Sequence, residues 1–267
     1  MAGLQALRFA ALGGDCELFV EGPGDLASAR SWLDAMDDRL TRFSPASELS
    51  RLNAAAGRWA DVSPELEALL RQSLDAFATS GGLVHIGVLP ALLAAGYTRD
   101  FAAGQTPPTG EAIVAPPLPD MLEVAPGRAR LRAGTAIDLG GIAKGWLADR
   151  AVERIGANAL ANLGGDLRAR GAGPDGEGWP VGFGGTTVAL RDLGAATSGT
   201  EGRRWGERLH HLIDPRTGRP AETDLVEVSV LAPTGAEAEV LAKTALLLGR
   251  EAGARFLDER SLGSYVR

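Results

Sequence analysis

The stretch Ala136-Ile-Asp-Leu-Gly-Gly-Ile-Ala-Lys-Gly145 leads from a strand end through a glycine pair into a helix. Adjacent glycines let backbone N–H groups approach a ligand closely, and the N-terminus of the following helix favours an anion. The spacing matches neither a P-loop nor a dinucleotide fingerprint. The segment is therefore interpreted either as an anion-binding turn or as an ordinary tight turn with Lys144 in solvent.

Helical periodicity extends on both sides of this stretch. Apolar residues recur every three or four positions from Leu26 to Phe43, which predicts one helix. A second helix is expected to start at Ser63-Pro64, with serine as N-cap and proline at the first helical position, and to stop at Gly81-Gly82. Residues 143–155 and 236–249 are expected to form two more helices.

Strand-like segments alternate with these helices. Residues 7–12 and 16–20 predict two strands with Gly13-Gly14 as the turn between them. Residues 160–170, 179–190 and 207–213 also have strand character, and 226–230 alternate as a half-buried strand does. The mixture predicts an α+β fold with mainly antiparallel sheets flanked by helices. A single domain over 1–267 is expected, with a soft lobe boundary in the proline-rich segment 105–120.

Composition excludes several classes of protein. The chain has 267 residues and a net charge of −7 without a basic stripe, which argues against nucleic-acid binding. No span of about 20 apolar residues indicates a membrane segment. Arg8 interrupts the apolar run before Cys16, so neither a signal peptide nor a lipoprotein cysteine is visible and a cytoplasmic location is expected. Lysine occurs only at Lys144 and Lys243.

Three further patterns have two interpretations each. The segment Asn162-Leu-Gly-Gly-Asp166 predicts either polar groups around an unusual backbone path or a simple bulge or hairpin turn. His210 and His211 are neighbours on a strand, so only one can enter a given site; a histidine there is either a general base or a structurally satisfied residue. Glu239 and Lys243 are four apart in the order that favours a helical ion pair, and the alternative is a solvated pair.

Together these segments resemble the FAD:protein FMN transferases, also called ApbE-like flavin transferases. The resemblance covers roughly residues 8–250, and no single piece is decisive. The matching segments occur in the family's order and comprise Phe9–Leu18, Phe43–Asn53, Asp138–Asp149, Asn162–Gly171, Thr197–Gly199, His211–Pro220 and Thr234–Gly249.

The resemblance implies a two-lobed fold with FAD between the lobes, and a magnesium-dependent reaction. Such enzymes split FAD, transfer FMN to a threonine hydroxyl of a target protein and release AMP. By position, His211 falls on the motif histidine and is the expected general base. The residues expected to bind FAD are Leu12, Phe43, His85, Asp138, Lys144, Leu212 and Lys243, and those expected near the metal are Gly141 and Glu239.

The chain departs from the family pattern at the metal. The helix after Thr234 usually carries two aspartates and a threonine that bind metal, and here those positions are Glu239, Ala242 and Lys243. A charged lysine has no lone pair and cannot ligate magnesium. Three hypotheses follow: an active transferase, an FAD-binding protein with Lys243 in place of the metal and weak or no activity, or a scaffold without flavin. FAD pyrophosphatase activity is a further alternative.

Overall fold

The computed structural model describes residues 3–206 and 209–267. These residues form two compact units. The first unit comprises Met1–Asp37, Ile142–Gly199 and Asp224–Arg267, and the second comprises Asp38–Gly141 and Thr200–Thr223. The proline-rich segment 105–120 lies within the second unit, and the lobe boundary expected near it stays a prediction.

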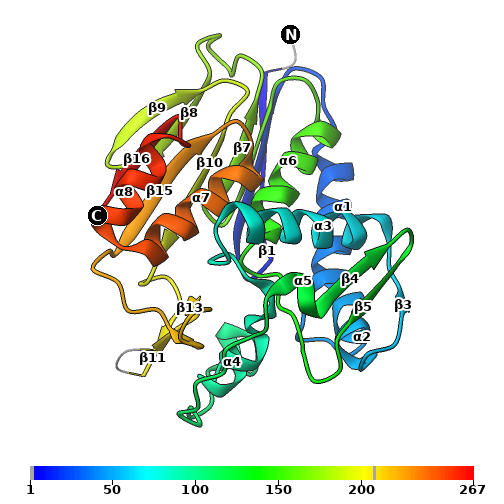
Figure 1. The fold of residues 1–267 in the computed structure, drawn as a ribbon. Coiled ribbons are helices and arrows are strands. Elements are labelled where there is room, and N and C mark those ends of the chain that lie inside the picture. Colours follow the sequence, from blue (N-terminus) through cyan, green and yellow to red (C-terminus); the bar gives the residue numbers. More distant parts are fainter. Residues whose placement is uncertain (1–2, 207–208) are drawn as a thin grey trace. The chain divides into compact units, whose positions relative to one another are not determined.

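A seven-stranded sheet forms the centre of the first unit (Figure 1), in the order β1-β2-β6-β7-β10-β15-β16. Every neighbouring pair is antiparallel, which confirms the expected sheet type. The strands are β1 (Leu4–Ala11), β2 (Gly14–Glu21), β6 (Ala159–Leu163), β7 (Asp166–Arg170), β10 (Gly194–Gly199), β15 (Glu227–Ala232) and β16 (Gly263–Val266).

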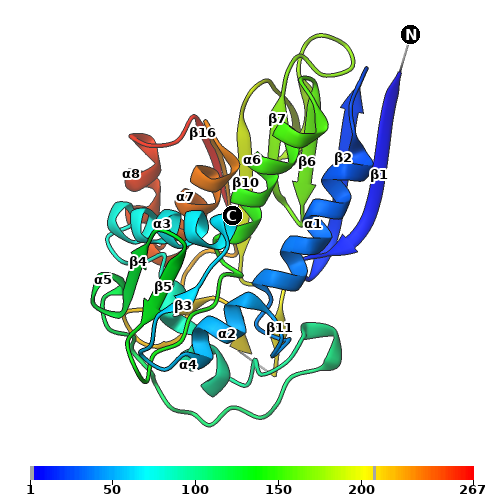
Figure 2. The same ribbon diagram turned by 90° about the vertical axis from the view of Figure 1, so that its right-hand side faces the viewer.

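Helices α6 (Ala143–Ile155) and α7 (Gly235–Leu248) pack side by side against this sheet (Figure 2). Helix α6 contacts β6 and β7, while α7 contacts β10 and β15. Eleven of the fourteen residues of α7 are buried, so α7 is a central helix rather than a surface one. The other two helices are α1 (Leu26–Leu40), which begins in this unit, and α8 (Arg250–Asp258).

The alternation of β7 decides which of its residues face α6. Leu167 and Ala169 belong to an apolar cluster with Trp179 and Leu190, which come from the hairpin of β8 (Trp179–Phe183) and β9 (Thr186–Leu190). Since successive side chains of a strand point to opposite faces, Asp166 and Arg168, which alternate with these two, point toward the helices instead. This alternation carries an aspartate and an arginine to the helix-covered face.

The second unit has short elements around its own core. One apolar cluster contains Leu92, Tyr97 and Ile213, with Trp205 packed against it. Helix α3 buries Leu66 and Leu70 among its apolar residues. The elements are α2 (Glu48–Ala54), β3 (Ala60–Asp61), α3 (Pro64–Thr79), η1 (Ile86–Val88), α4 (Leu89–Ala94), η2 (Phe101–Ala103), α5 (Leu118–Met121), β4 (Leu122–Ala125), β5 (Arg128–Leu131), β11 (Arg204–Trp205), β12 (Leu209–His210), β13 (Ile213–Asp214) and β14 (Arg219–Pro220).

Helix predictions were accurate at their starts. Helix α6 has the predicted bounds, and Ser63 caps α3 by accepting the N–H of Leu66 at 3.2 Å, with Pro64 following it. The predicted helix from Leu26 to Phe43 is too long, because α1 ends at Leu40.

Strand predictions needed more correction. The first hairpin turn is Leu12-Gly13 and not Gly13-Gly14, because Gly14 already pairs with Ala11. Ser229 is buried like its neighbours, so β15 is not half-exposed. The expected strand 207–213 is split into β12 and β13, and residues 207–208 lie outside the described part. Among the helices that the structure describes, none has the length and apolar character to cross a membrane.

Candidate functional site

The start of α6 places Lys144 beside the hairpin that joins β6 to β7. Gly164 and Gly165 form its two-residue loop, and both have positive φ, which glycine adopts without steric penalty. Asp166 follows the loop and accepts a hydrogen bond from the Lys144 ammonium. The segment Asn162–Asp166 is therefore a hairpin turn, the simpler of its two interpretations, and it also delivers a carboxylate to Lys144.

Glu239 on α7 joins the same group of charges. It is 3% exposed, and its Oε2 accepts the N–H of Gly145 at 2.9 Å, in the first turn of α6 where N–H groups lack helical partners. Burial and then the charge of Asp166 raise the pKa of Glu239 to about 7, while Lys243 and Lys144 act in the opposite direction. A solvated helical pair is therefore the wrong interpretation for Glu239. We call these four charged residues the lysine–carboxylate cluster.

The two signs of charge in this cluster differ in exposure. The side chain of Asp166 is only 4% exposed and Glu239 is 3% exposed, so both carboxylates are covered. The side chain of Lys144 is 20% exposed, and Lys243 is half-buried. The lysine side chains are therefore the more solvent-accessible members of the cluster.

This arrangement does not fit a magnesium ion. Magnesium needs several oxygen ligands at open positions, and it binds through carboxylates, waters and phosphates. In residues 3–206 and 209–267, no three His, Cys, Asp or Glu side chains are grouped to hold a metal. Ala242 is fully buried, and Lys243 offers an ammonium. The metal contacts expected at Gly141 and Glu239 stay a prediction that the cluster does not support.

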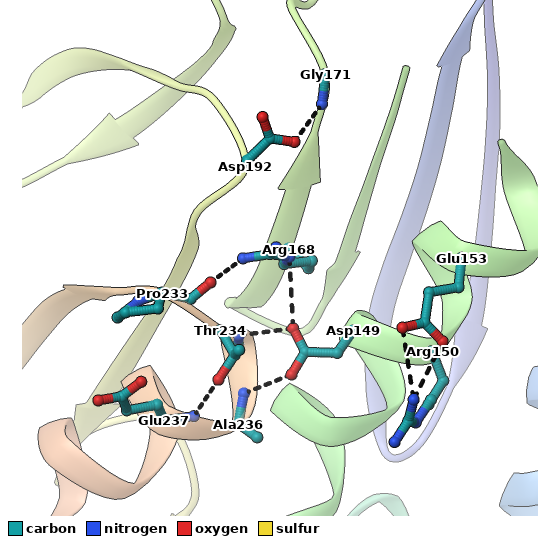
Figure 3. Close-up of polar contacts among 11 residues, drawn as sticks. Asp149, Arg150, Glu153, Arg168, Gly171, Asp192, Pro233, Thr234, Ala236 and Glu237 are labelled. Carbon is teal, nitrogen blue, oxygen red and sulfur yellow. Dashed lines mark hydrogen bonds and ion pairs between the residues drawn. The ribbon is translucent and has the colours of Figure 1, made fainter. Parts of the chain in front are cut away.

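Asp149 joins α6 to the N-terminus of α7 (Figure 3). Its Oδ1 accepts the N–H of Gly235 at 2.8 Å, and its Oδ2 accepts the N–H of Ala236 at 3.0 Å. Arg168 of β7 lies 3.7 Å from Oδ1 and donates to the carbonyl of Pro233. Burial raises the pKa of Asp149, although these contacts oppose the shift. The network holds together the two helices that carry the lysines.

Gly145 permits this close packing. A Cβ at Gly145 would collide with the backbone of Gly235, so the two helices can approach only because Gly145 has no side chain. The approach also brings the Gly145 N–H within reach of Glu239. The glycine after Lys144 therefore serves helix packing, a role that the glycine-rich pattern alone did not reveal.

Leu12 has an unusual backbone conformation in the first unit. Its φ is +55°, which is rare and strained for a residue other than glycine, asparagine or aspartate. The Asp37 carboxylate accepts the Leu12 N–H at 2.9 Å and holds this conformation. A strained loop residue of this kind is consistent with a ligand-contacting turn, and its expected contact with FAD stays a prediction.

In the second unit, Asp138 is held from two sides. Its Oδ1 accepts the N–H of Gly140 at 2.8 Å, which shapes the glycine turn, and its Oδ2 lies 2.7 Å from Nε of Arg42. The Arg42 side chain is 5% exposed and that of Asp138 is 17% exposed. Here the carboxylate, not the cation, is the more exposed partner. Gly141 follows this turn.

Phe43 lies over the same arginine. The Arg42 guanidinium carbon is 4.2 Å from the centre of the Phe43 ring and 4.6 Å from that of Tyr97. Phe43 remains 39% exposed, and Tyr97 contacts Trp205 with ring centres 5.4 Å apart. The exposed ring offers a surface on which a flat aromatic ligand can stack.

Two of the three histidines have both ring nitrogens engaged. His85 Nδ1 accepts the N–H of Gly87 at 2.9 Å, and its Nε2 donates to Pro116 O at 2.9 Å. His210 repeats this arrangement, with Nδ1 accepting from Leu212 at 3.3 Å and Nε2 donating to Ala221 O at 3.0 Å. Burial lowers the pKa of both rings.

His85 and His210 are therefore neutral structural residues. His85 is also the N-cap of η1, so its ring has a structural role at the start of this short helix. His211 follows the end of β12 and is half-buried, and Leu212 is 7% exposed. The assignment of His211 as general base stays a prediction.

A small cavity of about 260 Å³ lies beside the His85 turn. Pro90, Ile113 and Met121 line its apolar part, and Arg132 and Thr135 line its polar part. Ligand pockets are usually about 300–1,000 Å³, so this cavity does not hold a whole dinucleotide.

Sequence reasoning missed Arg42 and Asp166 as members of the site. Asp166 lies in a segment that had attracted attention, but its pairing with Lys144 spans 22 residues of sequence. Arg42 stands next to Phe43 and pairs with a carboxylate far along the chain. The sequence offered one indication for both residues, which is that each lies next to or within a segment that resembles the family.

Comparison with known proteins identifies a family. The sequence model of the ApbE family matches residues 12–266. An FAD:protein FMN transferase of Treponema pallidum (strain Nichols) is 34% identical over 260 residues, which are 80% of this chain and 68% of that protein. One of Klebsiella pneumoniae (strain 342) is 30% identical, over 90% of this chain and 75% of that protein.

Solved structures show the same fold. The ApbE protein of Thermotoga maritima superposes with a TM-score of 0.85 at 21% identity, covering 98% of this chain and 94% of that one. The apo form of the Pseudomonas stutzeri flavinyl transferase ApbE gives 0.81 at 22% identity, covering 96% and 88%. At these identities the likeness concerns the fold alone.

Proposed function

This chain belongs to the ApbE family, and on that premise we propose that it is an FAD:protein FMN transferase. It moves FMN from FAD to a threonine hydroxyl of a target protein and releases AMP. The match over residues 12–266 carries this proposal, because it spans every segment in which the candidate residues lie. The solvent-facing lysines of the first unit add a physical reason, since FAD carries a diphosphate.

The reaction requires an aligned attack on phosphorus, removal of the threonine proton and stabilisation of the developing phosphate charge. The threonine oxygen attacks the phosphorus on the FMN side, and the bond from that phosphorus to the AMP oxygen breaks. The hydroxyl must lose its proton, and the charge that develops on the phosphate oxygens must be stabilised. The electron pair of the broken bond leaves with AMP.

His211 is the proposed base for the threonine proton. The other two histidines hold backbone groups with both ring nitrogens, so protonating either ring would break a hydrogen bond. Histidine is suited to general-base work near neutral pH, and the family motif supports His211 in this role.

The remaining expected residues have roles that follow from their charge and shape. Lys144 and Lys243 face the phosphates. Asp138, whose two oxygens each keep a further lone pair beside Gly140 and Arg42, accepts from hydroxyl or N–H donors of FAD, and Phe43 offers a ring for stacking. Leu12, Leu212 and His85 are the remaining positions proposed to contact FAD, and His85 shapes its own turn through two backbone hydrogen bonds.

Magnesium has no step in this account. It would neutralise phosphate charge, but the lysine–carboxylate cluster already contains two ammonium groups and covers its carboxylates. The residues that would hold the ion at this helix do not fit it. The family's magnesium dependence is therefore not carried over to this chain.

Transfer can be tested with an acceptor peptide that contains one threonine. Mixing the protein with FAD and the peptide should yield an FMN adduct by mass spectrometry and one AMP per adduct by chromatography. A matched peptide with valine in place of threonine should give no adduct. AMP released with free FMN and no adduct would indicate a pyrophosphatase, and FAD bound without AMP release would indicate a binding protein; both results contradict transfer.

A further inference from the structure

Both lysines of the chain belong to the lysine–carboxylate cluster. Lys144 and Lys243 are its two lysines, and all its other strong bases are arginines. Lys144 on α6 pairs with Asp166, and the next residue, Gly145, donates its N–H to Glu239. Lys243 lies one helical turn after Glu239 on α7, so both lysines are adjacent to the same buried carboxylates although they come from different helices. Lysine is a compact point charge with three rotatable donors, whereas arginine is a planar fork. The cluster therefore concentrates the kind of cation that can turn several N–H donors toward phosphate oxygens.

Each carboxylate of the cluster is tied to the protein. Asp166 accepts from Lys144, and Glu239 accepts the N–H of Gly145 at 2.9 Å. Glu239 is buried in α7, and Asp166 is buried on β7. A divalent cation could reach them only by displacing these contacts and by approaching two ammonium groups of like charge. Asp166 therefore positions Lys144, and Glu239 joins the two helices, rather than either carboxylate offering an open ligand.

The outer surface of the cluster has the opposite character. The lysines are the members that reach solvent, and α6 adds the positive end of its dipole beside Lys144. Asp149 holds α6 and α7 together, which fixes the relative position of the two helices that carry the lysines. Such a pair is already organised for an anion with two adjacent negative groups.

We propose that Lys144 and Lys243 form a built-in cationic site that binds the diphosphate of FAD without a divalent metal ion. The inference rests on the proposed function for the identity of the ligand. Asp166 holds the Lys144 ammonium, and Glu239 lies one helical turn before Lys243 on α7. The lysines replace the charge that a metal would supply. Inorganic pyrophosphate, which has the same linked phosphates, binds at the same place.

Amine labelling tests this proposal on the unaltered protein. The protein is treated briefly with acetic anhydride in EDTA, and peptides containing Lys144 and Lys243 are quantified by mass spectrometry. FAD or pyrophosphate should lower acetylation of both lysines about tenfold at saturation, whereas riboflavin should not. The proposal is overturned if protection needs magnesium, or if FAD binds by fluorescence quenching and leaves both lysines reactive.

The experiment with pyrophosphate distinguishes failure of the proposed anion site from failure of the proposed transferase activity. If pyrophosphate protects the lysines in EDTA but FAD neither binds nor yields an adduct, the anion site stands and the transferase proposal fails. If FAD yields an adduct only with magnesium and leaves the lysines unprotected, the transferase proposal stands and the anion site is contradicted.

Charge variants supply an independent measurement. Lys243→Gln should weaken FAD binding about tenfold or more in EDTA, the scale of a lost charged hydrogen bond, while Lys243→Arg should keep most of it. Arg255→Gln on α8 removes an equal charge outside the cluster, where the side chain is 72% exposed, and should leave affinity unchanged. Equal losses in the glutamine variants at 243 and 255 would reduce the effect to net charge and overturn the site.

Discussion

Two ion pairs beside glycine turns, one in each unit, have opposite exposure. In the first unit the Lys144 side chain is 20% exposed and its partner Asp166 is 4% exposed. In the second unit the Arg42 side chain is 5% exposed and its partner Asp138 is 17% exposed. The first pair therefore presents a cation to solvent, and the second presents a carboxylate.

The difference teaches that exposure, and not composition, decides which ligand charge an ion pair receives. Both pairs combine one base with one aspartate, so their sequences predict similar chemistry. The outward ammonium suits phosphate, whereas the outward carboxylate suits hydroxyl and N–H donors. The exposed fractions also predict how much stability is lost when one partner of each pair is removed, because a buried charge left without its partner costs more than an exposed one.

The largest expected effect comes from removing the two aspartates. Asp138→Ala leaves the buried Arg42 guanidinium without its carboxylate, and should lower the free energy of unfolding by about 3–5 kcal/mol. Asp166→Ala leaves an ammonium that can extend into water, and should cost only about 1–2 kcal/mol. Urea denaturation of both variants measures the difference. Equal losses, or the reverse order, would break the comparison.

The next effect concerns the histidines of the second unit. His211→Ala should lower the rate of FMN transfer about 100-fold or more, because a positioned base contributes at least that much. His210→Ala should instead lower the free energy of unfolding, since it removes two backbone contacts. Single-turnover rates and thermal denaturation separate the two outcomes. A His211→Ala enzyme of normal rate would remove this residue from the base role.

A smaller effect is expected at the join between the two lysine-bearing helices. Asp149→Ala leaves the N–H groups of Gly235 and Ala236 without their acceptor, and should cost about 2 kcal/mol of unfolding free energy. Affinity for FAD in EDTA should fall as well, because Lys144 and Lys243 lose their fixed spacing. Thr234→Val, which removes the 3.1 Å cap on Glu237, is the matched control for a simple capping loss. An Asp149→Ala protein with full affinity would show that the spacing does not matter.

The last effects are slopes of stability with pH, and they have opposite signs in the two units. Glu239 has a folded pKa of about 7 against an ordinary 4.5, so the folded state binds its proton more tightly. Its contribution to stability is complete below pH 4.5 and is lost as the pH rises to about 7. The folded pKa of His85 lies below its ordinary 6.5, so its contribution is present above pH 6.5 and is lost as the pH falls through the folded value.

Urea midpoints between pH 5 and pH 8 test these signs in variants. Relative to the unaltered protein, Glu239→Gln should gain stability toward pH 8, and His85→Gln should gain it toward pH 5. Parallel curves for variant and unaltered protein would mean that neither group titrates differently on folding.

Local signals predicted much of this fold. Ser63-Pro64 and the 143–155 pattern placed two helix starts correctly, because capping and apolar spacing depend on neighbouring residues. The ordered family segments also pointed to the correct fold. Turn positions were less predictable: Leu12 at a φ of +55° contradicts its own conformational preference and depends on the distant Asp37.

The character of the site depended on tertiary packing. Sequence singled out Lys144, Glu239 and Lys243, but it did not show that the carboxylate is buried and the ammonium groups outward. That order follows from how α6 and α7 pack, through Gly145 and Asp149. Spacing on one helix predicts which residues share a face, but not which helix covers that face.

The central claim is that the two lysines of the lysine–carboxylate cluster bind the diphosphate of FAD without a divalent metal ion. The most direct measurement is the FAD dissociation constant in EDTA and in magnesium, for the unaltered protein and for Lys243→Asp. The unaltered protein should bind equally in both conditions. Lys243→Asp places a third carboxylate where the ammonium was, and should bind FAD about tenfold or more weakly in EDTA and recover with magnesium. An unaltered protein that loses FAD affinity tenfold in EDTA would contradict the claim.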